Sequence, residues 1–212
     1  MYQLYYYPLN ASIAPHFILE ELKIDFTLIM VDRKSNAQKS ADYLALNPAG
    51  RIPTLIDNGF AIFESPAICI HLAEVHPASN LIPQIGDKNR ALFFQWMMYL
   101  TNTVQAALMV YCYPQQHTTD VNTLECIVAA QESRITDMFT LLDRELKDKD
   151  FLIGQTISVA DYFLFMLAVW ADELKNPPLS FHHLSQYLRR LAQRDAVIKV
   201  CEKENLSLAD YQ

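Results

Sequence analysis

One short segment, Asn47 to Leu55, could offer its own main chain to a ligand. It carries Ile52-Pro53 just before a predicted hairpin, where a cis peptide bond would free the amide and carbonyl of Ile52 to pair with an extended peptide. Because only about 5–6% of X-Pro bonds in folded proteins are cis, a trans proline at a strand start is the competing interpretation. The neighbouring residues therefore decide whether this is a site.

A second motif, Glu64-Ser65-Pro66, begins a predicted helix. Ser65 is a favourable N-cap and Pro66 suits the first helical position, so the helix presents free amides. A carboxylate bound there gains hydrogen bonds and the favourable end of the helix dipole, while Glu64 can pair with an ammonium. The motif suits an α-amino acid head group. In the competing interpretation Ser65 only caps its helix and Glu64 is a solvated charge.

Alternating and helical patterns place these motifs in a small mixed domain. The expected strands are Leu4–Tyr7, Phe26–Val31, Thr54–Ile56 and Phe60–Phe63. Three helices are expected: one with Pro15 in its first turn, one over Ala41–Leu46, and one that begins at Ser65-Pro66 and ends before Pro77. The first strand–helix–strand unit should have parallel strands, and Asn58-Gly59 favours an antiparallel hairpin.

The second half of the chain has only helical patterns. Prolines and a glycine between Pro77 and Gly86 indicate a linker. The helical segments that follow are Lys88–Tyr111, Leu124–Leu146, Val159–Leu174 and Leu184–Lys203. Ser158 and Asp161 form a predicted capping box before the third of them. We therefore predict an α+β fold, a mixed domain followed by a helix bundle.

The composition excludes several classes of protein. The formal net charge of -7 repels nucleic acid and anionic lipid. The N-terminal residues do not have the pattern of a secretory leader, and no apolar run reaches membrane-spanning length, so we expect a cytoplasmic protein with no membrane partner. The four cysteines are widely spaced and suggest buried thiols, not disulfides or metal ligands, so no metal is expected.

Several motifs occur together in an order that resembles one family. They are Tyr5-Tyr6-Tyr7-Pro8, Ala14-Pro15-His16, Ala41-Asp42-Tyr43-Leu44, Asn47-Pro48 through Pro53-Thr54-Leu55, Glu64-Ser65 and Ser158-Val159-Ala160-Asp161. Across nearly its whole length the chain resembles the glutathione transferases, most closely the bacterial beta-like members. The resemblance implies a thioredoxin-like domain over 1–77, a linker over 78–86 and an all-helical domain over 87–212.

The resemblance also implies how glutathione is held. The backbone of Ile52, next to Pro53, would pair with the cysteinyl part, and Glu64 and Ser65 would hold the γ-glutamyl head. Arg51 and Lys34 would meet the glycine carboxylate, although Lys34 is also interpretable as a solvated charge. Glutathione would be a co-substrate with no bound cofactor, the protein would be a homodimer through the Glu64-Ser65 helix and the first long helix of the second domain, and its role would be detoxification.

Thiol chemistry requires a group that favours the thiolate. The beta class usually has Cys-Ser after the first strand, but here Ala11-Ser12 stands in that place. Without the cysteine, mixed-disulfide exchange loses its nucleophile. Ser12, just before a helix, is the first candidate donor to the sulfur, Asn10 the second and Tyr6 the third. Ser12 as a plain N-cap and Asn10 as a plain turn residue are the competing interpretations.

The second domain departs from the family pattern. Counted from Trp96, the family's pocket histidine and lysine fall on Gln105 and Ala106, and an asparagine that reaches the partner subunit falls on Met98. Four aromatic and sulfur-containing residues could instead line an apolar acceptor pocket, although such a stripe is also typical of core. They are Tyr99, Met109, Tyr111 and Tyr113.

Three functions are compatible with these residues. The first is an enzyme in which glutathione attacks a hydrophobic electrophile. The second is a glutathione-binding regulatory protein of the same fold, and the third is a glutathione-dependent reductase or peroxidase. The sequence does not name the electrophile, since acceptor pockets are apolar surfaces assembled from several elements.

Overall fold

The first part of the chain builds a mixed four-stranded sheet. Its strands are β1 (Tyr2–Tyr6), β2 (Phe26–Met30), β3 (Thr54–Asp57) and β4 (Phe60–Phe63), in the spatial order β2-β1-β3-β4. β1 is parallel to β2 and antiparallel to β3, which pairs antiparallel with β4. Asn58 and Gly59 both have positive φ (47° and 84°), as a tight hairpin turn requires. The predicted parallel unit and hairpin are both confirmed.

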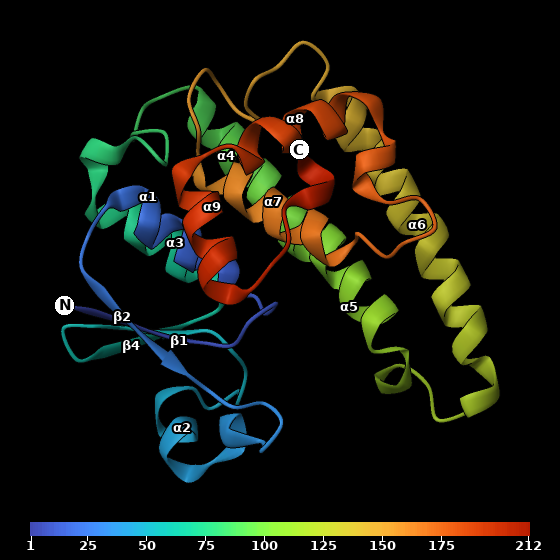
Figure 1. Ribbon diagram of the computed structural model, residues 1–212, viewed down its shortest axis with the longest axis horizontal. Coiled ribbons are helices and arrows are strands. Elements are labelled where there is room, and N and C mark those ends of the chain that lie inside the picture. The colour runs from blue at the N-terminus through green and yellow to red at the C-terminus, as the bar shows by residue number, and fades with distance from the viewer. The chain divides into compact units, whose positions relative to one another are not determined.

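Helices cover both faces of this sheet (Figure 1). They are α1 (Ile13–Leu22), α2 (Ala41–Leu46), α3 (Ser65–Val75) and, from the end of the chain, α9 (Asp195–Glu204). α1 packs against both α3 and α9, and α2 lies across the sheet from them. Leu4, Phe17 and Leu55 are fully buried in the core of this unit. The arrangement is the predicted thioredoxin-like fold.

The middle of the chain forms a helical unit. Its helices are α4 (Asn89–Tyr99), a π-helix (Leu100–Gln105), α5 (Ala106–Cys112), α6 (Leu124–Glu145), α7 (Val159–Trp170) and α8 (His182–Ala192). Short 3-10 turns lie in this unit at Pro114–Gln116, Val121–Thr123 and Pro178–Ser180, and elsewhere in the chain at Ala37–Lys39, Pro77–Ser79 and Ala209–Tyr211. α5 packs along α6, and α7 is buried from Val159 to Ala168. The predicted all-helical second half is confirmed, and none of its helices has the length and apolar character to cross a membrane.

At the start of α7 a buried carboxyl group is satisfied by hydrogen bonds. Asp161 is fully buried and forms the predicted capping box with Ser158, accepting from the amide (2.7 Å) and hydroxyl (2.6 Å) of Ser158. Its other oxygen accepts from the Leu152 amide (2.8 Å) and the Tyr187 hydroxyl (2.6 Å). Burial raises the pKa of the Asp161 carboxyl, and these four donors oppose that effect.

The computed structural model describes all 212 residues, and contacts divide them into two units. The first holds Met1–Gln84, Ala192–Asp210 and Gln212, and the second holds Ile85–Leu191 and Tyr211. The boundary at residue 84 falls inside the expected linker, but α9 belongs to the first unit and not to a domain over 87–212. The single helix expected over Leu184–Lys203 is also wrong, because the chain breaks between α8 and α9. The apolar side of α9, with Val197 and Val200 buried, packs on α1.

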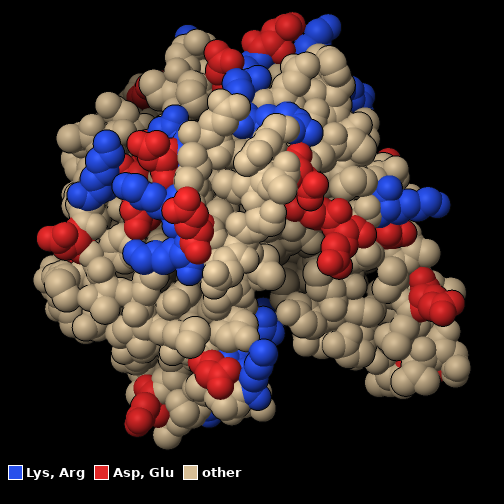
Figure 2. Space-filling model, viewed as in Figure 1, with Lys and Arg blue, Asp and Glu red and all other residues tan.

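Charged side chains are spread over the surface. Figure 2 shows Lys and Arg beside Asp and Glu in several separate groups on a face that is mostly uncharged. The net charge of -7 is therefore distributed and does not form one large acidic face in this view.

Candidate functional site

The segment before β3 presents an open main chain. The peptide bond between Ile52 and Pro53 is cis. Neither the amide nor the carbonyl of Ile52 has a hydrogen-bond partner in the chain. The carbonyl of the preceding Arg51, in contrast, accepts from the Tyr43 hydroxyl (2.8 Å) and from Asn47 Nδ2 (2.7 Å). The chain thus fixes Arg51 firmly and leaves the polar groups of Ile52 available to an extended ligand.

Tyr43 and Asn47 support this segment, a role that we did not predict from the sequence. Asn47 is 1% exposed, and its Oδ1 accepts from the Ala49 amide (3.0 Å). The Tyr43 hydroxyl also lies 2.9 Å from Thr54 Oγ1. Burial raises the pKa of Tyr43, so this phenol stays protonated and can donate. Both residues belong to motifs that carried the family resemblance, but only the fold brings them to the carbonyl of Arg51.

The start of α3 carries an unpaired carboxylate on a strained backbone. Glu64 has φ 69° and ψ 110°, a conformation that residues with a Cβ rarely adopt. Its side chain is exposed and has no partner in the chain. The amides of Ser65 and Ala67 are also unpaired, since the first backbone bond of the helix runs from the Ile68 amide to the Glu64 carbonyl (3.0 Å). Free amides and a carboxylate stand side by side here.

Ser65 does not cap α3, which corrects the sequence interpretation. Glu64 occupies the N-cap position, so the helix begins one residue earlier than expected. The buried hydroxyl of Ser65 donates to the Ala11 carbonyl at 2.6 Å. This bond joins α3 to the loop after β1, and it makes Ser65 a link between two candidate regions, with its amide as the group open to a ligand.

The hydroxyl of Ser12 is already engaged. Ser12 is fully buried at the N-cap position of α1 but makes no capping bond to the helix. Its Oγ donates to the Tyr7 carbonyl (3.1 Å) and accepts from the Tyr7 amide (3.3 Å). Ser12 therefore shapes the loop between β1 and α1, and its one hydroxyl proton is committed within the chain.

Asn10 and Tyr6 keep donors that are not committed. Asn10 is half-buried, and its Nδ2 donates one hydrogen to the Pro8 carbonyl (3.3 Å), which leaves the second. Arg33 Nη1 donates to Asn10 Oδ1 at 3.2 Å, and Arg33 is a residue that sequence reasoning missed. The Tyr6 hydroxyl has no hydrogen-bond partner in the chain, and its ring meets the His16 ring edge-to-face, with centroids 6.3 Å apart.

The two expected cations, Arg51 and Lys34, are both exposed. No hydrogen bond joins Lys34 to another candidate residue.

The four expected acceptor residues lie in the second unit, on α4, on α5 and just after α5. Tyr99 is half-buried against Trp96 (centroids 5.5 Å apart). The pKa of Tyr111 is raised, first by burial and next by the Glu132 carboxylate. Tyr113 and Met109 are half-buried, and the Tyr113 amide donates a hydrogen bond to the Met109 carbonyl (3.0 Å).

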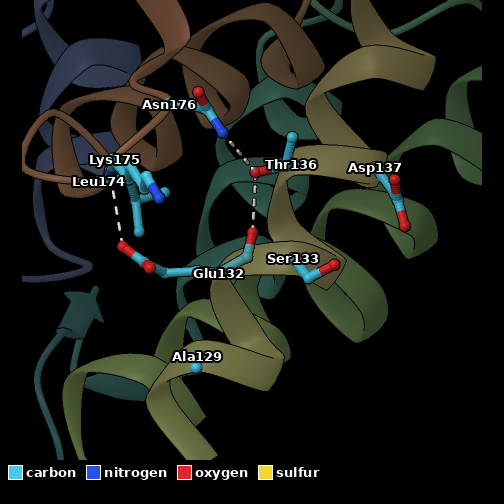
Figure 3. A pocket seen from close by; sticks show the side chains of 8 residues that line it. All are labelled: Ala129, Glu132, Ser133, Thr136, Asp137, Leu174, Lys175 and Asn176. Carbon is cyan, nitrogen blue, oxygen red and sulfur yellow. Dashed lines mark hydrogen bonds between the residues drawn. The ribbon is translucent and has the colours of Figure 1, made fainter. Parts of the chain in front are cut away.

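A cavity of about 360 Å³ lies elsewhere in this unit, between α6 and the segment after α7 (Figure 3). Several polar groups in its walls are hydrogen-bonded to one another: Asn176 Nδ2 donates to Thr136 Oγ1 (3.4 Å), and the Lys175 amide donates to Glu132 Oε1 (3.4 Å). A second cavity, near the ends of α1 and α3, is lined by 21–22 and 75–79. None of the expected site residues lines either cavity.

Cys69, Cys112 and Cys201 offer little thiolate. All four are free. Burial raises the pKa of Cys69 and Cys112, and it raises the pKa of Cys201 to about 12. A raised pKa lowers the thiolate fraction at neutral pH, so these side chains are poor nucleophiles.

Known proteins share both halves of this architecture. Family models described as the N-terminal and C-terminal domains of glutathione S-transferase match residues 2–74 and 100–195. The chain is 28% identical over 206 residues to glutathione S-transferase GstA of Escherichia coli O157:H7, covering 96% of this chain and 99% of that protein. A sphingomonad glutathione S-transferase solved with glutathione is 28% identical, with a TM-score of 0.83 over 97% of this chain and 100% of that one.

One of the similar solved structures belongs to the bacterial beta class. The beta class glutathione S-transferase of Sphingomonas chungbukensis is 28% identical, with a TM-score of 0.84 over 97% of this chain and 100% of that one. The matched models, the full-length similarity and the mixed-sheet-plus-helices fold all agree. This chain is therefore a member of the glutathione S-transferase family, a glutathione-using enzyme related to the bacterial beta-class proteins.

Proposed function

We propose that this enzyme conjugates reduced glutathione to a hydrophobic electrophile by stabilising the glutathione thiolate. The observation that carries the proposal is the set of open polar groups on the first unit. These groups are the amide and carbonyl of Ile52, the Glu64 carboxylate and the unpaired amides of Ser65 and Ala67. They complement an extended peptide that ends in an α-amino acid head, and a sphingomonad relative has been solved with glutathione.

In the proposed complex each part of glutathione has a partner. The cysteinyl main chain pairs with Ile52, beside Pro53. The γ-glutamyl carboxylate accepts from the first amides of α3, where the helix dipole adds attraction, and its ammonium pairs with Glu64. The exposed cations Arg51 and Lys34 are proposed to meet the glycine carboxylate.

We propose Asn10 as the main donor to the sulfur. The bond from the Arg33 guanidinium fixes and polarises the Asn10 amide, so its remaining N–H is directed and more acidic than in water. A positive charge nearby also lowers a thiol pKa. Tyr6 is the second candidate, because its hydroxyl has no partner. Ser12, with its proton on the Tyr7 carbonyl, is proposed to hold the loop.

The proposed reaction balances without a cofactor. The thiol proton passes to water, the sulfur electron pair forms the new carbon–sulfur bond, and the leaving group departs with its own electron pair. The electrophile would lie against apolar residues of the second unit, for which Tyr99, Met109, Tyr111 and Tyr113 remain the proposed lining. A homodimer, a cytoplasmic location and a role in detoxification are proposed with this function.

Calorimetry with glutathione and turnover of a neutral aryl halide test the proposal. We expect binding in the micromolar to millimolar range. Asn10→Ala should lower kcat by about ten- to a hundredfold and raise the pKa of the bound thiol, read from thiolate ultraviolet absorbance, with KM little changed. Tyr6→Phe and Ser12→Ala are the matched comparisons. No binding at millimolar glutathione, or binding without turnover of any electrophile, would contradict conjugation.

A glutathione-dependent reductase or peroxidase is separable by one variant. Ala11 stands where the beta class has its cysteine, and burial raises the pKa of three of the four thiols. A protein with all four cysteines replaced should therefore keep its aryl halide turnover. Loss of that turnover would favour a mechanism through a protein thiol.

A further inference from the structure

A π-turn interrupts the long helix that opens the second unit. The chain runs through α4, the π-helix Leu100–Gln105 and α5 without a break (Figure 1). The backbone keeps ordinary helical angles at both ends of the turn, with φ -61° and ψ -43° at Leu100 and φ -60° and ψ -43° at Gln105. Hydrophobic periodicity predicts an uninterrupted helix over this stretch, so the apolar pattern does not require the wider turn. Such turns are rare within helices and are frequent at functional sites.

A threonine hydroxyl supports the start of the π-turn. Thr101 Oγ1 lies 2.9 Å from the Met97 carbonyl oxygen and 3.4 Å from that of Met98. It also lies 3.2 Å from Asn102 Oδ1, so three acceptors share its one proton. The backbone bonds change here from the α pattern to the π pattern. The hydroxyl therefore supplies an additional donor to the carbonyls that directly precede the change.

The helix changes its packing partner at the π-turn. α4 and the π-turn pack against α7, with Leu100 and Val104 fully buried, whereas α5 packs along α6. A π-turn holds about one residue more than an α-turn, which rotates every later side chain by about 100° relative to an uninterrupted helix. The rotation coincides with the change of partner from α7 to α6.

The π-turn also divides the proposed lining for the electrophile. Tyr99 directly precedes the turn, and Met109, Tyr111 and Tyr113 follow it. All four side chains are half-buried, so each can offer part of its surface to a ligand. The rotation that the turn introduces therefore decides which of the later side chains share a side of the helix with Tyr99.

We propose that this π-turn is the specificity-determining element for the electrophile. It sets the rotation of α5 relative to α4, and thereby the shape of the surface that the four lining residues form together. Thr101 is a positioning residue, because its hydroxyl acts on the backbone of the turn. This inference rests on the proposed conjugating function. The groups that would hold glutathione belong to the first unit, so the turn should affect the choice of electrophile and not the affinity for the peptide.

Thr101→Val tests the proposal, with Thr140→Val as the matched control. Thr140 Oγ1 donates to the Thr136 carbonyl (2.8 Å), the same kind of bond, but within an ordinary α-turn of α6. The readout is the ratio of kcat/KM for a flat aryl halide to that for a longer arylalkyl isothiocyanate. We expect Thr101→Val to change this ratio by about fivefold or more. Thr140→Val should leave it within about twofold, and calorimetry should give both variants a Kd for glutathione within about twofold of wild type.

Deletion of Asn102 is the stronger perturbation. Asn102 is exposed, and its removal takes one residue out of the turn, so the segment can return to α-helical spacing and α5 can rotate by about 100°. We expect the ratio to change by about tenfold or more in this variant. Urea denaturation identifies whether it folds, and if it does not fold, Thr101→Val alone decides.

Three results would overturn the inference. They are an unchanged ratio in Thr101→Val or in a folded deletion variant, an equal change in Thr140→Val, and an effect of Thr101→Val confined to glutathione affinity. Wild-type protein that conjugates neither electrophile would overturn the proposed function and this inference together. Active wild type with an unchanged ratio in the variants would overturn this inference alone.

Discussion

The two units treat their polar groups in opposite ways. In the helical unit the buried carboxylate of Asp161 accepts four hydrogen bonds and has no capacity left for a ligand. In the first unit the Glu64 carboxylate and both backbone groups of Ile52 have no partner in the chain. Glu64 is exposed and Ile52 half-buried, so water can solvate these groups and a ligand can replace that water. The contrast distinguishes polar groups that stabilise the fold from polar groups that remain available to the proposed ligand.

The largest expected effect is a loss of stability in the helical unit, where the buried carboxylate of Asp161 is fully hydrogen-bonded. Asp161→Ala leaves the Ser158 and Leu152 amides and the Tyr187 hydroxyl without an acceptor, so the free energy of unfolding should fall by about 3 kcal/mol or more. Urea denaturation measures it, with the exposed Asp137→Ala as control. Protein that remains folded should bind glutathione normally. A loss below about 1 kcal/mol would show that the network is not structural.

In the first unit, where polar groups have no partner in the chain, Glu64→Ala should produce the largest loss of glutathione affinity. Removal of a charge-assisted partner should cost about 2 kcal/mol, or roughly a 30-fold rise in Kd. Calorimetry measures it, with the exposed Glu74→Ala on the same helix as control. Unchanged affinity would mean that Glu64 is only a solvated charge, and the comparison between the units would fail at this residue.

Asn47→Ala tests the support beneath the open segment. Asn47 supplies one of the two donors to the Arg51 carbonyl, so its loss should loosen Ile52 and raise KM for glutathione by about tenfold. Tyr43→Phe removes the other donor and should act in the same direction. If both variants keep the wild-type KM, then the position of Ile52 does not depend on this pair.

The smallest effect concerns backbone strain at Glu64. Glycine tolerates the positive φ of this position and alanine does not, so Glu64→Gly should unfold with a free energy about 1 kcal/mol higher than Glu64→Ala. Both variants should lose glutathione affinity equally, since neither has the carboxylate. Equal stability of the two would show that the strain is negligible.

Local sequence predicted much of the first unit. Alternation identified the strands, Asn58-Gly59 identified the hairpin, and Glu64-Ser65 identified a helix start with a carboxylate beside free amides. These features depend on contacts between near neighbours in the chain, so short windows contain them. The role of Ser65 was misread by one position, because a helix start is uncertain until its cap geometry is known.

Contacts between distant segments were not predictable in this way. The bond from Ser65 to Ala11 spans 54 residues, that from Arg33 to Asn10 spans 23, and that from His16 to Glu204 spans 188. The return of α9 to the first unit was missed for the same reason. Its apolar stripe fits a helix of either unit, and only the packing against α1 decides between them.

The sequence by itself determined the order of the elements, the family and the residues that can carry charge or donate hydrogen bonds. Tertiary structure decided which of those groups remain free: it committed the Ser12 hydroxyl to Tyr7, left Asn10 and Tyr6 with open donors, and paired His16 with Glu204. The physical reason is that a polar group becomes available to a ligand only after the fold has satisfied or failed to satisfy it, and most of its possible partners lie far away in the chain.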